Sequence, residues 1–120
     1  MARTAVDVTT LSKTAFTTQG AGTTADPTND HVITVNFPLD ELVLVFTQTD
    51  ATARAATIVA GDNPPAFSAG QGDLTQSIAQ NGVYYVAGLE SGRFLQSDGT
   101  LHIDLAASFA GTIKAYRIPR

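Results

Sequence analysis

The sequence predicts an all-β protein, a single-domain β-sandwich of about eight short strands joined by tight hairpins. Apolar residues recur mostly at a spacing of two, which is typical of strands with one buried face. Turn-forming dipeptides, Asn81-Gly82 and Asp98-Gly99, separate these runs. No window of 11–18 residues carries a helical apolar face, and residues 1–120 fit one domain. The pattern leaves jelly-roll-like and immunoglobulin-like topologies open.

The individual strands follow from this alternation. The first candidate, residues 4–10, is weak, whereas residues 31–37 place alternate apolar side chains on one side. Residues 42–46 are apolar on both faces, as in a central strand covered on both sides. Thr100–Leu105 alternates most clearly of all. The remaining predicted strands are residues 57–60, 74–80, 83–87 and 111–118.

The connections between strands are predicted from turn chemistry. Asn81-Gly82 is expected to form a type I′ hairpin between residues 74–80 and 83–87. Asp98-Gly99 is expected to do the same between residues 94–96 and 100–105. Two stretches are not strands. Residues 17–27 lack core-forming side chains, so residues 1–30 are expected to include an extended N-terminal arm, and residues 61–72 form a long loop.

Composition and charge exclude several classes of function. Seven basic and eleven acidic residues give a net charge of −4, so the chain lacks the basic face that a nucleic-acid partner needs. No apolar run is long enough to span a membrane, and no secretory signal opens the chain, so we expect synthesis in a cytoplasm. Without cysteine, thiolate chemistry, disulfides and Cys-based metal sites are excluded.

A search for catalytic patterns predicts no enzyme and no cofactor. Residues 20–25 match the letters of a dinucleotide fingerprint but lack the flanking strand and helix that it requires. His31 and His102 fall on different predicted strands, so we predict no metal site. No small-molecule substrate is expected. Pairing of carboxylates is spatial, however, and the sequence alone leaves open a pair drawn from the following residues: Asp40, Glu41, Asp73, Glu90 and Asp104.

Two segments are instead predicted to contact another protein chain. The extended residues 2–8 could add a strand to a neighbour's open sheet edge. Phe67 stands between a Pro-Pro pair and a glycine-rich stretch, where the core does not explain it. The candidate contact residues are Arg3, Val6, Val8, Pro64, Pro65 and Phe67. Tyr84 and Tyr85 are adjacent and therefore point to opposite faces, one toward the core and one outward.

Several stretches of the chain together resemble one family. They are Met1 to Ala5, Leu42 to Val45 with the polar turn at Asp50, Ala56 to Gly61, Arg93 to Asp104, and the closing strand to Tyr116 and Pro119. In these stretches the chain is similar to small virion proteins of tailed bacteriophages that decorate or cement the capsid.

The resemblance implies a structural protein on the capsid exterior of the virion. Its partner would be the major capsid protein of the same phage, whose adjacent subunits it would bridge as trimers or as lattice-bound monomers. Modest interfaces suffice for such a role because neighbouring contacts add avidity. The alternatives are a β-sandwich protein associated with a tail, neck or fibre, and a carbohydrate-binding module that uses Tyr84 or Tyr85 with Phe67 as its platform.

Overall fold

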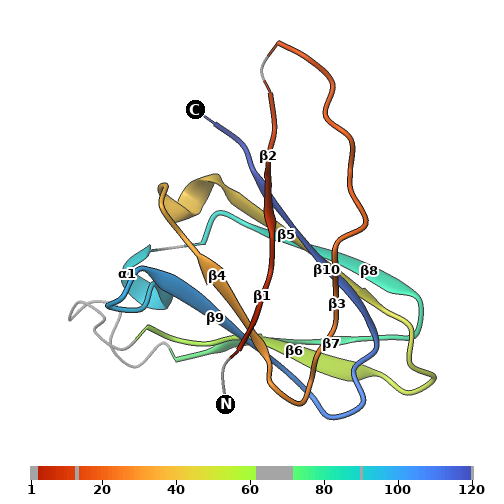
Figure 1. The fold of residues 1–120 in the computed structure, drawn as a ribbon. Coiled ribbons are helices and arrows are strands. Elements are labelled where there is room, and N and C mark those ends of the chain that lie inside the picture. Colours follow the sequence, from red (N-terminus) through yellow and green to blue (C-terminus); the bar gives the residue numbers. More distant parts are fainter. Residues whose placement is uncertain (1–2, 13, 62–71, 90, 120) are drawn as a thin grey trace.

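The structure is a computed structural model that describes residues 3–12, 14–61, 72–89 and 91–119. Within these residues, ten strands form two sheets that pack face to face (Figure 1). The only helical segments in the described ranges are the single turns η1 (Leu39–Glu41) and α1 (Ser91–Phe94). The prediction of an all-β sandwich is therefore confirmed.

The order of the strands defines the topology. Sheet A contains, in spatial order, β1 (Thr4–Ala5), β4 (His31–Thr34), β9 (Thr100–Leu105), β6 (Arg54–Ile58) and β7 (Leu74–Ile78). Sheet B contains β2 (Val8–Thr10), β10 (Gly111–Arg117), β5 (Leu42–Gln48) and β8 (Gly82–Ala87), and β3 (Thr23–Thr24) also pairs with β10. The order β4-β9-β6-β7 facing β3-β10-β5-β8 is that of a jelly roll rather than an immunoglobulin fold.

The core lies between the two sheets and follows the predicted alternation. On β9, Leu101, Ile103 and Leu105 point inward while the residues between them are partly exposed. On β5, Leu42, Leu44 and Phe46 do the same from the opposite sheet. Leu101 and Ile103 are fully buried. The period of two therefore fixes which side chains each strand gives to the core.

The N-terminal segment closes one side of the sandwich. Strand β1 pairs in parallel with β4, and the chain then crosses to sheet B, where β2 pairs in parallel with β10. Val6 lies at the crossing, is 4% exposed and belongs to the core. The weak strand predicted at residues 4–10 is thus present as β1 and β2. The expectation that residues 1–30 include an extended arm does not hold for these residues, because their backbone pairs with strands of the same chain.

On the opposite side of the sandwich, β7 and β8 are both edge strands and belong to different sheets. The predicted hairpin at Asn81-Gly82 is therefore wrong, because this turn carries the chain from one sheet to the other. The buried Gln48 explains the crossing, since its Nε2 donates to the carbonyl of Ile78 at 3.0 Å and its backbone carbonyl accepts the N–H of Asn81 at 2.7 Å. Only Asn81 of the pair takes a positive φ, 61°.

At Asp98-Gly99 the predicted turn is present, but it is not of the predicted type and the described residues just before it, 94–96, form no strand. The N–H of Gly99 donates to the carbonyl of Gln96 at 3.0 Å, and the N–H of Gln96 donates to the carbonyl of Thr100 at 2.8 Å. Gly99 alone takes a positive φ, 84°, so the turn is a type I turn with a bulge rather than type I′. The segment before it contains the helical turn α1 instead of the predicted strand.

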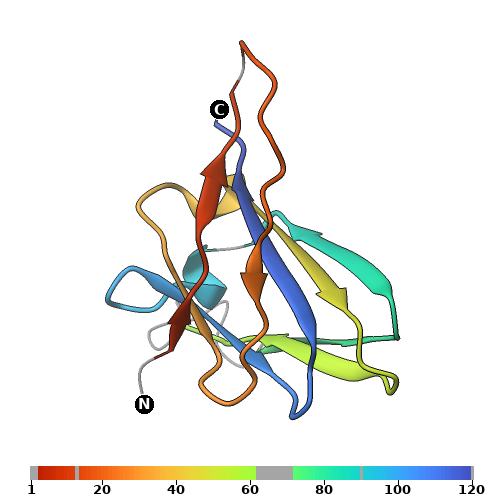
Figure 2. The ribbon, with the colours of Figure 1, turned by 45° about the vertical axis from the view of Figure 1, so that its right-hand side comes forward.

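Between β2 and β3 the chain leaves the body of the sandwich. Figures 1 and 2 show this connection, drawn in orange, extending beyond the ends of both sheets. We call residues 14–22 of this connection the projecting loop. The predicted arm is thus a loop within the chain, anchored at both ends by strands that pair with β10.

Candidate interaction surfaces

The outward side of sheet B is apolar over two neighbouring strands. Cross-strand pairing places Val43 beside Ala87 and Val45 beside Tyr85, with Val83 next along β8. These five residues define the outer apolar face. Val45 is 4% exposed although it lies outside the core cluster, and Tyr85 is 71% exposed. The prediction that β5 is covered on both sides holds at Val45, whereas Val43 and Thr47, which point the same way, are only partly buried.

The outward side of sheet A differs. Inward-facing Ala56 and Ile58 alternate on β6 with outward Thr57, whose Oγ1 lies 3.0 Å from that of Thr75 on β7. The next strand, β9, presents His102 and Asp104 outward. A sheet with one solvated face normally shows this alternation of apolar and polar residues. Sheet B departs from this pattern over β5 and β8, and an exposed apolar patch of this kind is a candidate contact surface.

An apolar cleft opens between the two edge strands β7 and β8. Its volume is about 120 Å³. The lining residues are Phe46, Ala56, Ile58, Leu74, Gln76, Ile78, Tyr84, Tyr85 and Val86. Neither β7 nor β8 contains a charged residue, although charges are the usual protection of an exposed edge. One side of the sandwich is closed by Val6, whereas this opposite side is open at the cleft.

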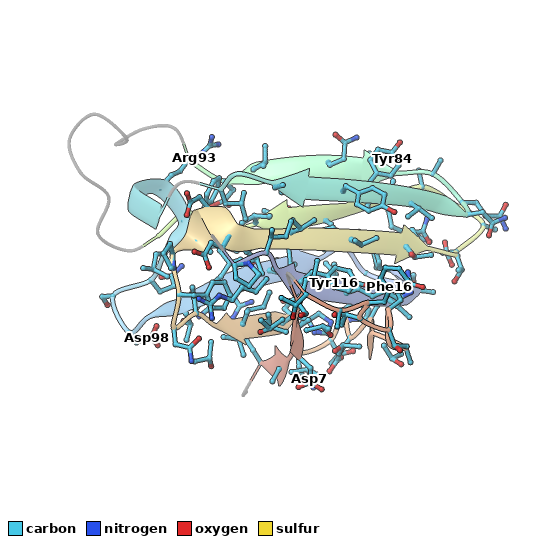
Figure 3. The ribbon with its side chains drawn as sticks, turned by 90° about the horizontal axis from the view of Figure 1, so that it is seen from above. Asp7, Phe16, Tyr84, Arg93, Asp98 and Tyr116 are labelled. Carbon is cyan, nitrogen blue, oxygen red and sulfur yellow. The ribbon has the colours of Figure 1, made fainter. Side chains whose placement is uncertain are left out.

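Tyr84 and Tyr85 point to opposite faces, as predicted. Tyr84 lies beside inward-facing Phe46 and is 38% exposed, whereas Tyr85 lies beside Val45 on the outer apolar face; both tyrosines border the cleft. Figure 3 shows Tyr84 on β8. One tyrosine, Tyr84, points toward the core as expected, but it is not a buried core residue because the cleft leaves it accessible. Phe67 lies outside the described residues, so the platform of Tyr84 or Tyr85 with Phe67 stays a prediction.

The projecting loop carries the most exposed aromatic side chain in the described residues, Phe16, with a relative exposure of 107%. Figure 3 labels this ring. Nearby, the hydroxyl of Thr17 accepts the N–H of Ser12 at 3.3 Å, and the hydroxyl of Ser12 accepts the N–H of Thr14 at 3.1 Å. Sequence reasoning missed Phe16; its signal was one aromatic residue beside a long stretch of small and polar residues.

The structure describes three of the predicted contact residues: Arg3, Val6 and Val8. They lie on the side of the sandwich that the N-terminal segment closes, which we call the sealed side. Nη1 of Arg3 contacts Oδ1 of Asp104 at 2.6 Å and also donates to the carbonyl of His31 at 3.2 Å. Val6 is a core residue, which corrects its assignment as a contact, and Val8 packs against the core. Pro64, Pro65 and Phe67 lie outside the described residues.

On the same side, His31 and Asp26 form hydrogen bonds and have shifted pKa values. Its ring is fully buried; Nε2 accepts the N–H of Asp26 at 2.9 Å, and Nδ1 lies 3.1 Å from the carbonyl of Thr4. Burial lowers the pKa of His31 below its ordinary value of 6.5. Hydrogen bonds, the first from the hydroxyl of Thr4, lower the pKa of Asp26. This histidine therefore acts as a neutral structural group.

The described residues hold no group of three or more His, Asp or Glu placed to bind a metal ion. Two of the carboxylates that could have paired are engaged elsewhere: Asp104 binds Arg3, and Oε1 of Glu41 accepts from Nε of Arg117 at 2.8 Å. Glu90 lies outside the described residues.

Comparisons of the chain with protein-family models, with curated proteins and with solved structures find no match. In the part of the chain that the structure describes, no helix has the length and apolar character needed to cross a membrane.

Proposed function

We propose that this chain is a non-enzymatic virion structural protein of a tailed phage, which decorates and cements the capsid exterior. The observation that carries the proposal is the asymmetry between the two exposed sheet faces. Sheet A presents mostly polar side chains to solvent, with the partly exposed Val32 and Ala55 among them, while sheet B presents the outer apolar face. The major capsid protein is the proposed partner of that face.

The chemistry of the outer apolar face suits a protein partner. Tyrosine is enriched at protein interfaces, where its large rigid ring buries area at little entropic cost. Tyr85 stands out from β8 beside Val45, and the neighbouring cation is Lys114 on β10. Such a flat, largely uncharged surface lets a chain of net charge −4 approach another protein without strong repulsion.

The fold and the sequence resemblance agree with this role by analogy. Jelly rolls form viral capsid domains as well as lectin domains, so the fold alone does not choose between them. The resemblance of the sequence to phage decoration proteins favours the capsid. A shell repeats the binding site many times, so an interface on the order of 800 Å² per partner would hold the protein in place.

The proposal is tested by co-sedimentation with the phage's own shells, unexpanded and mature, and with separated tails. We expect saturable binding to mature shells at a fixed ratio to the capsid subunit. Binding to tails would favour the tail, neck or fibre alternative. Binding to neither would contradict a virion role, and glycan screening would then test the carbohydrate-binding alternative.

A matched pair of variants tests the surface. Tyr85→Lys places a charge on the outer apolar face, and we expect at least about tenfold weaker shell binding, as for loss of an interface tyrosine. Thr75→Lys places the same charge on the outward face of sheet A, at the other edge strand, and is expected to change binding less than about twofold. Thermal unfolding checks that both variants fold. Equal losses from both variants would refute the assignment of the surface.

A further inference from the structure

We infer that Phe16 of one copy of this protein inserts into the apolar cleft between β7 and β8 of a second copy. The inference goes beyond the proposed capsid contact, because it uses the projecting loop and the cleft, which share only Tyr85 with the outer apolar face. It concerns copies of the chain binding to one another and can be tested without shells.

The first argument is that the ring of Phe16 is not buried by its own chain. Its relative exposure of 107% means that the whole ring is in water, on a loop that leaves the body of the sandwich (Figures 1 and 2). Exposing a phenyl ring costs free energy in proportion to its apolar area, and burying such a ring is a dominant contribution at interfaces. A ring held out in this way is suited to insertion into another molecule.

The second argument is that the cleft has a suitable size and lining. A cavity of about 150 Å³ lined by Leu, Ile and Phe binds a benzene ring. The cleft measures about 120 Å³, is open on one side, and is bordered by the aliphatic side chains of Ile58, Leu74 and Ile78 together with the rings of Phe46 and Tyr84. Aromatic neighbours offer edge-to-face contacts to an entering phenyl group.

The third argument is charge. Each copy carries a net charge of −4, so copies repel one another unless the meeting surfaces lack charge. Strands β7 and β8 contain no charged residue, and neither do residues 14–22 of the projecting loop; Lys13, which precedes them in the sequence, carries a charge opposite to the net charge of the chain. These are two surfaces on which two copies can approach without opposing like charges.

The fourth argument concerns the backbone. A single phenyl ring buries far less than the roughly 800 Å² per partner of a standard interface, so the loop must contribute as well. Since β7 and β8 are edge strands of their sheets, each leaves one row of N–H and C=O groups without a strand partner among the described residues. A loop that enters the cleft between them brings its backbone to these groups, as in strand addition.

The resulting contact is heterologous, because the loop and the cleft are different surfaces of the same chain. Head-to-tail contacts of this kind generate closed rings or open chains rather than two-fold dimers. Linked copies on a shell would also connect the capsid subunits beneath them.

The first test is sedimentation velocity over a range of protein concentrations. We expect concentration-dependent association that Phe16→Ala weakens at least about tenfold, as for loss of an interface anchor, and that Phe16→Leu weakens less. The control is Ile118→Ala, which removes another exposed apolar side chain, 43% exposed, that does not line the cleft. The inference is overturned if the native protein stays monomeric up to about 1 mM, where even weak specific contacts form, or if Phe16→Ala associates like the native protein.

The second test locates the contact by disulfide formation, since the native chain has no cysteine. Thr17→Cys places a thiol beside Phe16, and Gln76→Cys places one at the cleft. A mixture of these two variants should form the mixed disulfide faster than a mixture of Thr17→Cys with Thr34→Cys, an exposed control position on β4. Equal rates would overturn the inference, as would a disulfide within one chain when both thiols are placed in the same dilute protein.

These outcomes are separable from those of shell binding. If the copies associate but bind no shell, the proposed function fails and the copy-to-copy contact stands. If Phe16→Ala and the native protein are both monomeric and both bind shells, the contact fails and the proposed function stands.

Discussion

Replacing His31 by Phe tests how much the buried hydrogen bonds of this histidine stabilise the sealed side of the sandwich. The substitution keeps a planar ring in a fully buried position but removes both ring nitrogens. The N–H of Asp26 then loses its acceptor at 2.9 Å, and the carbonyl of Thr4 loses its contact with Nδ1 at 3.1 Å. Leaving a buried donor unpaired costs about 1–3 kcal/mol and losing the second hydrogen bond about 1 kcal/mol, so we expect a loss of about 2–4 kcal/mol in the free energy of unfolding.

The same histidine predicts a pH dependence of stability. Because Nε2 accepts a backbone N–H, the folded protein holds His31 neutral with its proton on Nδ1, and burial lowers its pKa below 6.5. The unfolded chain binds this proton at a higher pH than the folded chain does. The contribution of neutral His31 is therefore fully present above about pH 6.5 and is lost as the pH falls through the folded pKa, by at most about 1.4 kcal/mol per pH unit.

The assay is urea unfolding followed by circular dichroism at several values between pH 5 and pH 8. In this interval the carboxyl groups with lowered pKa values, Asp26, Asp50 and Asp98, stay ionised and do not contribute to the slope. The native protein should lose stability toward pH 5. The His31→Phe variant, less stable at pH 8, should show a smaller slope.

The other histidine supplies the control. His102 is partly exposed on the outward face of β9, and Nε2 of its ring lies 3.3 Å from the hydroxyl of Thr100. His102→Phe should change the free energy of unfolding by less than about 0.5 kcal/mol, as is usual for surface positions. The reasoning is refuted if His31→Phe costs as little as His102→Phe, or if it leaves the pH slope of the native protein unchanged.

Three further predictions concern stability and are measured by the same urea unfolding at pH 8. Leu101→Ala, at a fully buried position of β9, should cost about 2–5 kcal/mol, and a cost under about 1 kcal/mol would contradict its place in the core. Gln48→Leu should cost about 2–4 kcal/mol because the buried carbonyl of Ile78 loses its donor; no loss would mean that this side chain does not hold the crossing between sheets. Gly111→Ala should cost about 2 kcal/mol or more, because Gly111 has φ 125° and a Cβ would collide with the carbonyl oxygen of Thr47; a neutral result would contradict this register of β10 and β5.

The positions of the strands could be predicted because alternation is a local property. Thr100–Leu105 was predicted with the bounds that the structure shows, and β10 differs by one residue at its end. In each strand, successive side chains point to opposite faces whatever the partner strand is. The opposite orientations of Tyr84 and Tyr85 followed from the same rule.

The partners of the strands could not be predicted in this way. Asn81-Gly82 has the composition of a hairpin turn, yet it joins two different sheets because Gln48, far away in the sequence, binds the backbone of Ile78 before the turn and of Asn81 within it. Val6 looked like part of an extended arm, and it became a core residue only because β1 and β2 pair with β4 and β10. Such pairings bring together residues that are distant in the chain, so no local pattern specifies them.

The candidate surfaces, like the strand pairings, could be predicted only in part from the sequence. By itself, the sequence determined an all-β chain without the residues for thiol or basic-face chemistry, and it showed that the strand containing Val43 and Val45 is apolar on both faces. Only the tertiary structure decided that the outward one of those faces continues onto β8 at Tyr85, that β7 and β8 leave a cleft, and that Phe16 stands in water. The physical reason is that burial depends on what lies next to a side chain in space, and long-range packing, rather than the period of the sequence, sets those neighbours.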